Sequence, residues 1–115
     1  AYHLHSHGNY RRAQNSGAYA PASVTPDSTA LGQQWFLNPG ITANTFRILS
    51  TRDGRPLRTT DGIAVTLGSA GETGTAVEWR FTAETNGHGR HYILHPASNK
   101  RLRLNTNGTW SLVAA

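Results

Sequence analysis

The stretch FRILSTRDGRPLR, residues 46–58, gives the strongest indication of the fold, because the chain repeats its pattern. It predicts a strand from Phe46 to Leu49, a polar turn at Asp53-Gly54 and a returning strand that ends near Leu57. Similar sequences stand near both ends of the chain, YHLHSHGNYRRA from residue 2 and YILHPASNKRLRL from residue 92. The sequence therefore predicts three copies of one hairpin unit.

The spacing of aromatic residues supports this repeat. Tyr2, Phe46 and Tyr92 each begin a copy, with Leu or Ile two positions later, and they are 44 and 46 residues apart. Trp35 and Trp79 are also 44 residues apart. Because independent landmarks share one period, the sequence predicts a triplicated domain. The predicted single domain covers residues 1–115, with repeats at about 1–45, 46–91 and 92–115.

Short alternating runs of apolar and polar residues predict an all-β chain. One example is Val77-Glu-Trp79-Arg-Phe81, and no window shows a sustained helical stripe. The 12 glycines separate such runs as turn residues. A single unit of this kind cannot bury its apolar face alone, but three units around an axis can close a barrel and remove exposed sheet edges.

The composition narrows the function without fixing it. The 115 residues suffice for one core, and the absence of cysteine excludes disulfides and thiolate metal sites. The net charge is +5, but the basic residues are spread along the chain, so nucleic acid is a less favoured partner. There is no signal peptide and no apolar run of about 20 residues, so no membrane span is predicted and localisation stays open.

The repeat motifs resemble those of the ricin B-type (R-type) lectin β-trefoil. Each unit has an aromatic-x-Ile or aromatic-x-Leu start, and in the second and third units a polar turn and a Leu follow. Gln33-Gln34-Trp35 matches the Q-x-W motif, whereas Val77-Glu78-Trp79 keeps only the tryptophan. Tyr2-His-Leu-His5 and Tyr92-Ile-Leu-His95 are similar to repeats of arabinofuranose-binding trefoil modules. The resemblance implies a β-trefoil that binds carbohydrate.

The third repeat is shorter than the other two. A third tryptophan strand would lie about 44 residues after Trp79, near position 124, and the sequence ends at Ala115. The sequence therefore predicts a trefoil whose third repeat lacks its last strand. An open sheet edge at that place favours pairing with a partner, such as a second copy of the chain.

The resemblance implies shallow sugar sites, built from an aromatic face and from Asp, Asn or Gln side chains. In the second repeat the acid is Asp61, but Ile63, Ala64 or Val65 replaces the aromatic residue. The candidate carbohydrate-binding residues are Asn15, Tyr19, Gln33, Asp61, Asn105, Asn107 and Trp110. Structural roles compete with this hypothesis: Asp61-Gly62 is a turn dipeptide, Gln33 belongs to a structural motif, and Trp110 fits an inward position as well.

Other functions are less favoured. His3, His5 and His7 share a strand face, but no cysteine or well-placed acid completes a metal site, so no metal or other cofactor is predicted. The sequence lacks G-x-S-x-G, H-E-x-x-H and P-loop motifs, so a non-enzymatic protein is predicted. The alternatives are a protein-binding trefoil, such as a protease inhibitor using arginine-rich loops 52–55 and 99–103, and a polyanion-binding protein.

Overall fold

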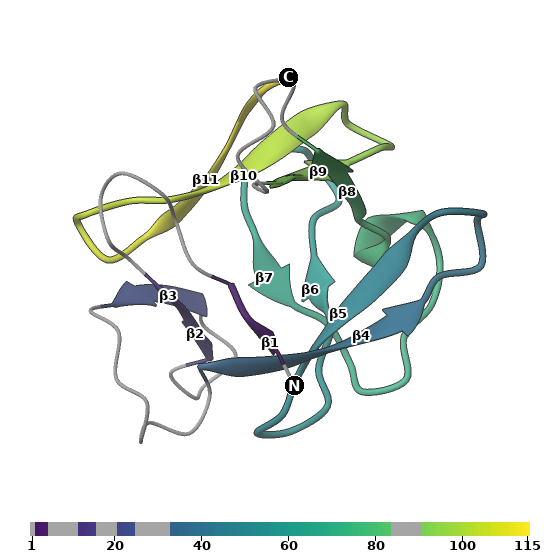
Figure 1. Ribbon diagram of the computed structural model, residues 1–115, viewed down its shortest axis with the longest axis horizontal. Coiled ribbons are helices and arrows are strands. Elements are labelled where there is room, and N and C mark those ends of the chain that lie inside the picture. The colour runs from purple at the N-terminus through teal and green to yellow at the C-terminus, as the bar shows by residue number, and fades with distance from the viewer. Residues whose placement is uncertain (1, 5–11, 16–20, 25–32, 84–90) are drawn as a thin grey trace.

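The computed structural model describes residues 2–4, 12–15, 21–24, 33–83 and 91–115, and it is almost entirely β-structure (Figure 1). The elements are β1 (Tyr2–His3), β2 (Arg12–Asn15), β3 (Pro21–Val24), β4 (Gln34–Pro39), β5 (Phe46–Ser50), β6 (Leu57–Arg58), β7 (Thr66–Leu67), the short helix η1 (Thr75–Val77), β8 (Arg80–Ala83), β9 (His91–His95), β10 (Lys100–Leu104) and β11 (Trp110–Ala114). In the part of the chain that the structure describes, no helix is long and apolar enough to span a bilayer.

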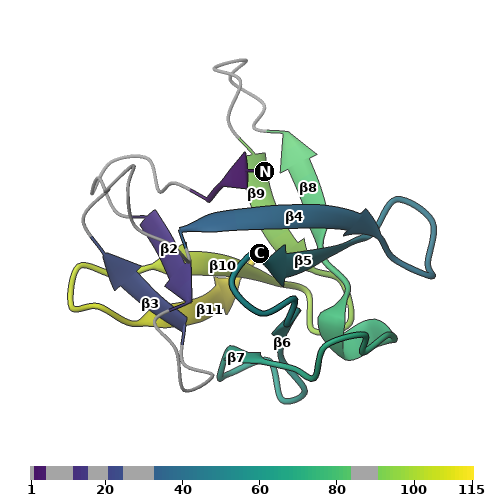
Figure 2. The same cartoon turned by 90° about the horizontal axis from the view of Figure 1, so that it is seen from below.

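The strands pair in an order that winds around a common axis. One sheet has the order β1-β4-β5, and another has the order β11-β10-β9-β8. A bridge between Phe46 and Trp79 joins the two sheets, with backbone hydrogen bonds of 2.7 and 2.9 Å. Three antiparallel hairpins, β2–β3, β6–β7 and β10–β11, lie toward one side of the molecule (Figure 2).

The registers of the three hairpins show the threefold repeat directly. Each hairpin contains one pair of residues that are ten positions apart in the sequence. The first members of these three pairs follow one another at 44 and 45 residues. The pairs are Ala13–Ser23, Leu57–Leu67 and Leu102–Leu112. The predicted β-trefoil and its repeat of about 44–46 residues are therefore confirmed.

Trp35 and Trp79, the two tryptophans that share the period of the repeat, make the same contact in their two repeats. The indole Nε1 of Trp35 donates to the carbonyl of Ala13 at 3.2 Å, and that of Trp79 donates to the carbonyl of Leu57 at 3.0 Å. Both rings are completely buried, so each indole N–H needs an acceptor inside the protein. The aliphatic core around them comes from strands of all three repeats: Leu4, Ile48, Leu57, Leu67 and Leu104.

The barrel is open between β1 and β9. Among the described residues no strand lies between these two, and the space there is an apolar groove of about 430 Å³. Its lining comes from strands of all three repeats: Tyr2, Leu4, Leu37, Phe46, Phe81, His91 and Ile93. Within residues 91–115 the third repeat forms β9, β10 and β11, which agrees with the predicted lack of a last strand in this stretch. Self-association through this edge stays a prediction, which sedimentation equilibrium of the chain would check.

Candidate functional site

Two of the predicted site residues lie in the turn between β10 and β11. The side-chain oxygen Oδ1 of Asn107 accepts hydrogen bonds from the backbone N–H and the hydroxyl of Thr109, at 3.1 and 2.6 Å. Gly108 follows with φ of 92°, a conformation that glycine adopts without strain. Asn107 therefore closes the turn with one side of its amide, while the residue as a whole remains exposed.

Asn105 joins this turn to the next strand. Its Nδ2 donates to the hydroxyls of Thr109 and Ser111, at 3.1 and 3.2 Å. Its backbone N–H also donates to the carbonyl of Thr109, at 2.9 Å. The end of the hairpin thus carries a small network of hydroxyl and amide groups, the kind of surface that exchanges hydrogen bonds with sugar hydroxyls.

Trp110 is the first residue of β11, directly after the same turn, and is only half-buried. Its ring meets Trp35 edge to face, with centroids 5.9 Å apart, and it packs against the core. Its Nε1 is buried and has no acceptor among the described residues. The inward position that competed with sugar binding is thus occupied in part, which leaves only the outer portion of the ring for a ligand.

Asp61 lies between β6 and β7, in the loop of the second repeat's hairpin. One carboxylate oxygen, Oδ1, accepts from the backbone N–H groups of Ile63 and Ala64, at 2.8 and 3.0 Å. These bonds, of which the one from Ile63 has the largest effect, lower the pKa of Asp61 below its usual value. The other oxygen, Oδ2, has no hydrogen bond to any described residue. Ile63, 71% exposed, stands beside it in place of an aromatic platform.

The structure describes the candidate residues of the first repeat, Asn15, Tyr19 and Gln33, only in part. Gln33 is 1% exposed, and the equivalent Val77 is completely buried, so this position belongs to the core. Asn15 is the last residue of β2, opposite Pro21, and its side chain lies outside what the structure describes. Tyr19 also lies outside the described residues. A sugar site on the first repeat therefore stays a prediction.

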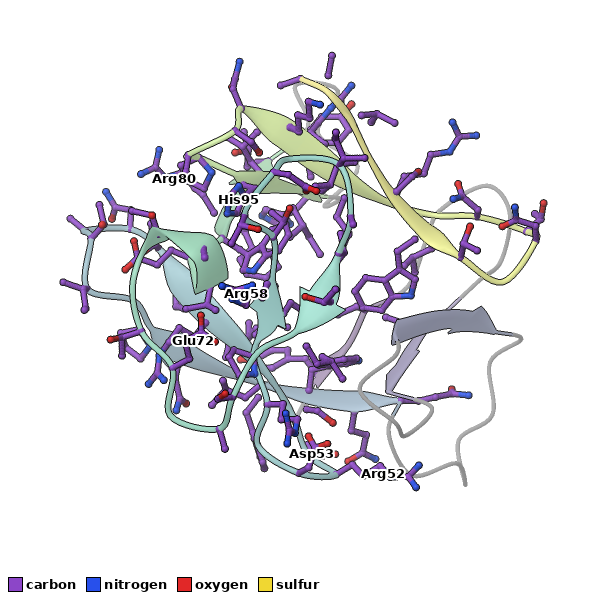
Figure 3. All side chains as sticks on the ribbon, turned by 180° about the vertical axis from the view of Figure 1, so that it is seen from behind. Arg52, Asp53, Arg58, Glu72, Arg80 and His95 are labelled. Atoms are coloured by element: carbon purple, nitrogen blue, oxygen red, sulfur yellow. The ribbon has the colours of Figure 1, made fainter. Side chains whose placement is uncertain are left out.

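An ion pair that the sequence did not indicate lies on the second repeat. Arg58 Nε donates to Glu72 Oε2 at 2.8 Å, and the two side chains point toward each other in Figure 3. Glu72 Oε1 accepts from the backbone N–H of Ser69 at 3.1 Å. Arg58 precedes Asp61 by three residues, but Glu72 is 14 residues further on, so no local pattern pointed to the pair.

The histidines do not form a metal site in the described part of the chain. No three His, Cys, Asp or Glu side chains gather there closely enough to hold an ion. His5, His7 and the side chain of His3 lie outside the described residues.

His95, in contrast, is part of the core, at 2% exposure. Its ring lies 5.0 Å from that of Trp79, its Nε2 is 3.0 Å from the carbonyl oxygen of Thr75, and its Nδ1 is 2.8 Å from Ser98 Oγ. The carbonyl requires a proton on Nε2, so in the neutral ring Nδ1 accepts from the serine hydroxyl. Burial lowers the pKa of His95 from its usual 6.5.

This histidine makes stability depend on pH. Because the folded pKa is lower, the unfolded chain takes up a proton first as pH falls below about 6.5. Its contribution is therefore full above that pH and is lost as pH falls through the folded pKa. We expect the melting temperature to fall between about pH 7.5 and pH 5.5, with a shallower fall for His95→Gln. His91→Gln, at an exposed histidine, is the control and should keep the wild-type slope.

Comparison with solved structures supports the fold and shows where trefoils of this shape occur. The structure "SeviL bound to asialo-GM1 saccharide" matches with a TM-score of 0.82 and 18% identity, over 98% of this chain and 86% of that one. The designed threefold-symmetric protein ThreeFoil matches at 0.82 and 16% identity, over 99% and 89%. The BEL β-trefoil matches at 0.76 and 18% identity, over 96% and 81%.

Proteins of other kinds contain the same fold. The similar structures include the Haemophilus ducreyi cytolethal distending toxin and the β1,3-galactosidase BT0265. This chain covers 24% of the galactosidase. At identities below 20% these likenesses establish the fold alone. No protein-family model matches the sequence, and no curated protein matches it either.

Proposed function

We propose that the protein is a non-enzymatic carbohydrate-binding module that holds sugars in shallow sites on its trefoil hairpins. The observation that carries the proposal is the polar end of the β10–β11 hairpin, where the side chains of Asn105, Thr109 and Ser111 form a network of amide and hydroxyl hydrogen bonds. Trp110, half-buried, lies between Thr109 and Ser111 in the chain. Asp61, with one carboxylate oxygen free of described partners, provides a second site. Shallow sites of this kind are individually weak, and several of them raise avidity.

The described acids support binding rather than hydrolysis. Asp53 and Glu72 pair with arginines, whereas Asp61 and Glu78 accept backbone N–H groups that close turns. A glycosidase needs two carboxyl groups that face each other across a substrate. The described carboxylates instead have separate structural partners. The trefoil fold shared with SeviL, whose structure holds the asialo-GM1 saccharide, supports the same proposal.

A neutral-glycan array that includes the asialo-GM1 saccharide tests the proposal. We expect specific signals, and we expect Asn105→Ala to weaken binding of a positive glycan about fivefold, because one hydrogen bond is worth about 1 kcal/mol. Asn38→Ala, at an exposed asparagine on β4, is the matched control and should bind as the wild type. An array on which the wild type, Tyr19→Ala and Trp110→Ala all give no signal would contradict the proposal.

A further inference from the structure

The outer face of the sheet β8-β9-β10-β11 carries arginines without acidic partners. On these strands Phe81, Ile93, Leu102 and Leu112 pack against the core. Since neighbouring residues of a strand point to opposite faces, the residues between them point outward. The outward set on the first three strands contains Arg80, Tyr92, Arg101 and Arg103, and we call these four residues the arginine face.

The strand register places these side chains within reach of one extended ligand. Arg80 on β8 and Arg101 on β10 both lie opposite Leu94 of β9, so their backbones are about 10 Å apart, twice the spacing of strands. Arg103 lies two residues beyond Arg101, about 7 Å further along β10. Figure 3 shows Arg80 nearer the rim of the molecule than His95. The three guanidinium groups therefore fit separate anionic groups along a chain better than a single ion.

No described acid neutralises these arginines. The third repeat, residues 92–115, contains Lys100, Arg101 and Arg103 but neither Asp nor Glu. The described carboxylates bond elsewhere, as shown above, and the ion pairs of the described residues involve only Arg55 and Arg58. A surface with one sign of charge raises the local concentration of ligands with the opposite charge.

The guanidinium groups also lack described hydrogen-bond acceptors. The Nε atoms of Arg80 and Arg101 are buried, and neither has a partner among the described residues. Buried donors without partners are uncommon in folded proteins. Arg101 is held in place by the ring of Tyr92, with its Cζ 4.2 Å from the ring centroid. Arg80 and Arg101 are half-buried and Arg103 is exposed, so a ligand reaches these side chains through the parts of the guanidinium groups that are not buried. Sulfate and carboxylate groups are the acceptors that match a guanidinium group.

We propose that the arginine face binds a sulfated or carboxylated polysaccharide. Nucleic acid fits the face less well, because proteins that hold single strands use open aromatic platforms on which bases stack. Tyr92 is 39% exposed, but Arg101 covers one side of its ring, and it is the one aromatic residue among the outward residues described on these strands. This site is distinct from the neutral-sugar sites proposed on the hairpins and does not depend on them.

Isothermal titration of the chain with a heparin hexasaccharide, at low and at physiological salt, tests the proposal. We expect binding that weakens with salt, and we expect Arg103→Gln and Arg101→Gln each to weaken it about tenfold. Arg52→Gln removes the same charge from the exposed β5–β6 turn and should change affinity by less than about twofold. Arg103 is exposed, so Arg103→Gln tests the site even where Arg101→Gln disturbs folding.

Three results would overturn the proposal: no binding of heparin, equal losses for Arg52→Gln and Arg103→Gln, or tighter binding of a single-stranded oligonucleotide with the same number of charges. Equal losses would mean that only net charge matters. The two proposals can fail separately. Arg103→Gln should leave neutral-glycan signals unchanged, whereas Asn105→Ala should leave heparin binding unchanged.

Discussion

Replacing Trp79 by alanine is expected to lower the free energy of unfolding by about 5 kcal/mol, the largest loss that we predict for a single substitution. The ring is completely buried, so its removal loses transfer free energy and leaves a cavity. The change also leaves the carbonyl of Leu57 without the indole donor at 3.0 Å and removes the ring against which His95 packs. Urea denaturation followed by circular dichroism measures the loss.

Two further substitutions separate the causes. Trp79→Phe keeps most of the ring but removes the indole donor, and we expect it to cost about 2 kcal/mol. Phe36→Ala, at a half-exposed aromatic residue of β4, is the matched control and should cost less than about 1 kcal/mol. A loss below about 1 kcal/mol for Trp79→Ala would contradict the central position of this residue. Because small domains have only about 5–15 kcal/mol of stability, the alanine variant should lie near the limit of folding.

Replacing Glu78 by alanine is expected to lower the free energy of unfolding by about 3 kcal/mol. Its carboxylate accepts from the backbone N–H groups of Ile41 and Thr42, at 2.9 and 3.3 Å, and from the Thr42 hydroxyl at 2.7 Å. It thereby joins the β4–β5 turn to the start of β8, next to the bridge between the two sheets. Glu78 is 3% exposed, so its removal loses three hydrogen bonds to a charged acceptor at a buried position, although Ile41 and Thr42 themselves are exposed.

The pH dependence identifies the role of this carboxylate. The Thr42 hydroxyl bond, opposed by burial, lowers the pKa of Glu78 from its usual 4.5. A lowered folded pKa means that the contribution is present above about pH 4.5 and is lost as pH falls through the folded pKa. Urea denaturation at a series of acid pH values should therefore show a steeper loss for the wild type than for Glu78→Gln. Equal slopes would mean that another group causes the acid transition.

The fold could be predicted from the sequence because its signals are local and periodic. Phe46, Trp35 and Trp79 recur at a fixed period, and the alternating runs beside them give the strand faces. The candidate site was predictable only in part. Asn105 and Asn107 follow from the hairpin pattern, but the contacts of their amide groups depend on the geometry of the turn.

One segment differs from its prediction. Residues 99–103 were expected to form an arginine-rich loop that faces a protein partner. Residues 100–104 instead form β10, because Leu102 and Leu104 alternate with arginines and pack toward the core. The arginines therefore lie on the flat outer side of a sheet rather than on a protruding loop, which is the arrangement that leads to the proposal of a polysaccharide site.

The sequence alone was enough to show that the chain is all-β, that it repeats three times and that two tryptophans share the period of the repeat. Only the tertiary structure shows that Glu78 meets the turn at 41–42 and that Arg58 meets Glu72. It also shows that Arg80 and Arg101 lie on either side of β9, opposite the same residue. The reason is the register of the strands. A shift of one residue would turn every side chain of a strand to the opposite face. A local sequence pattern does not reveal the register between strands that are far apart in the sequence.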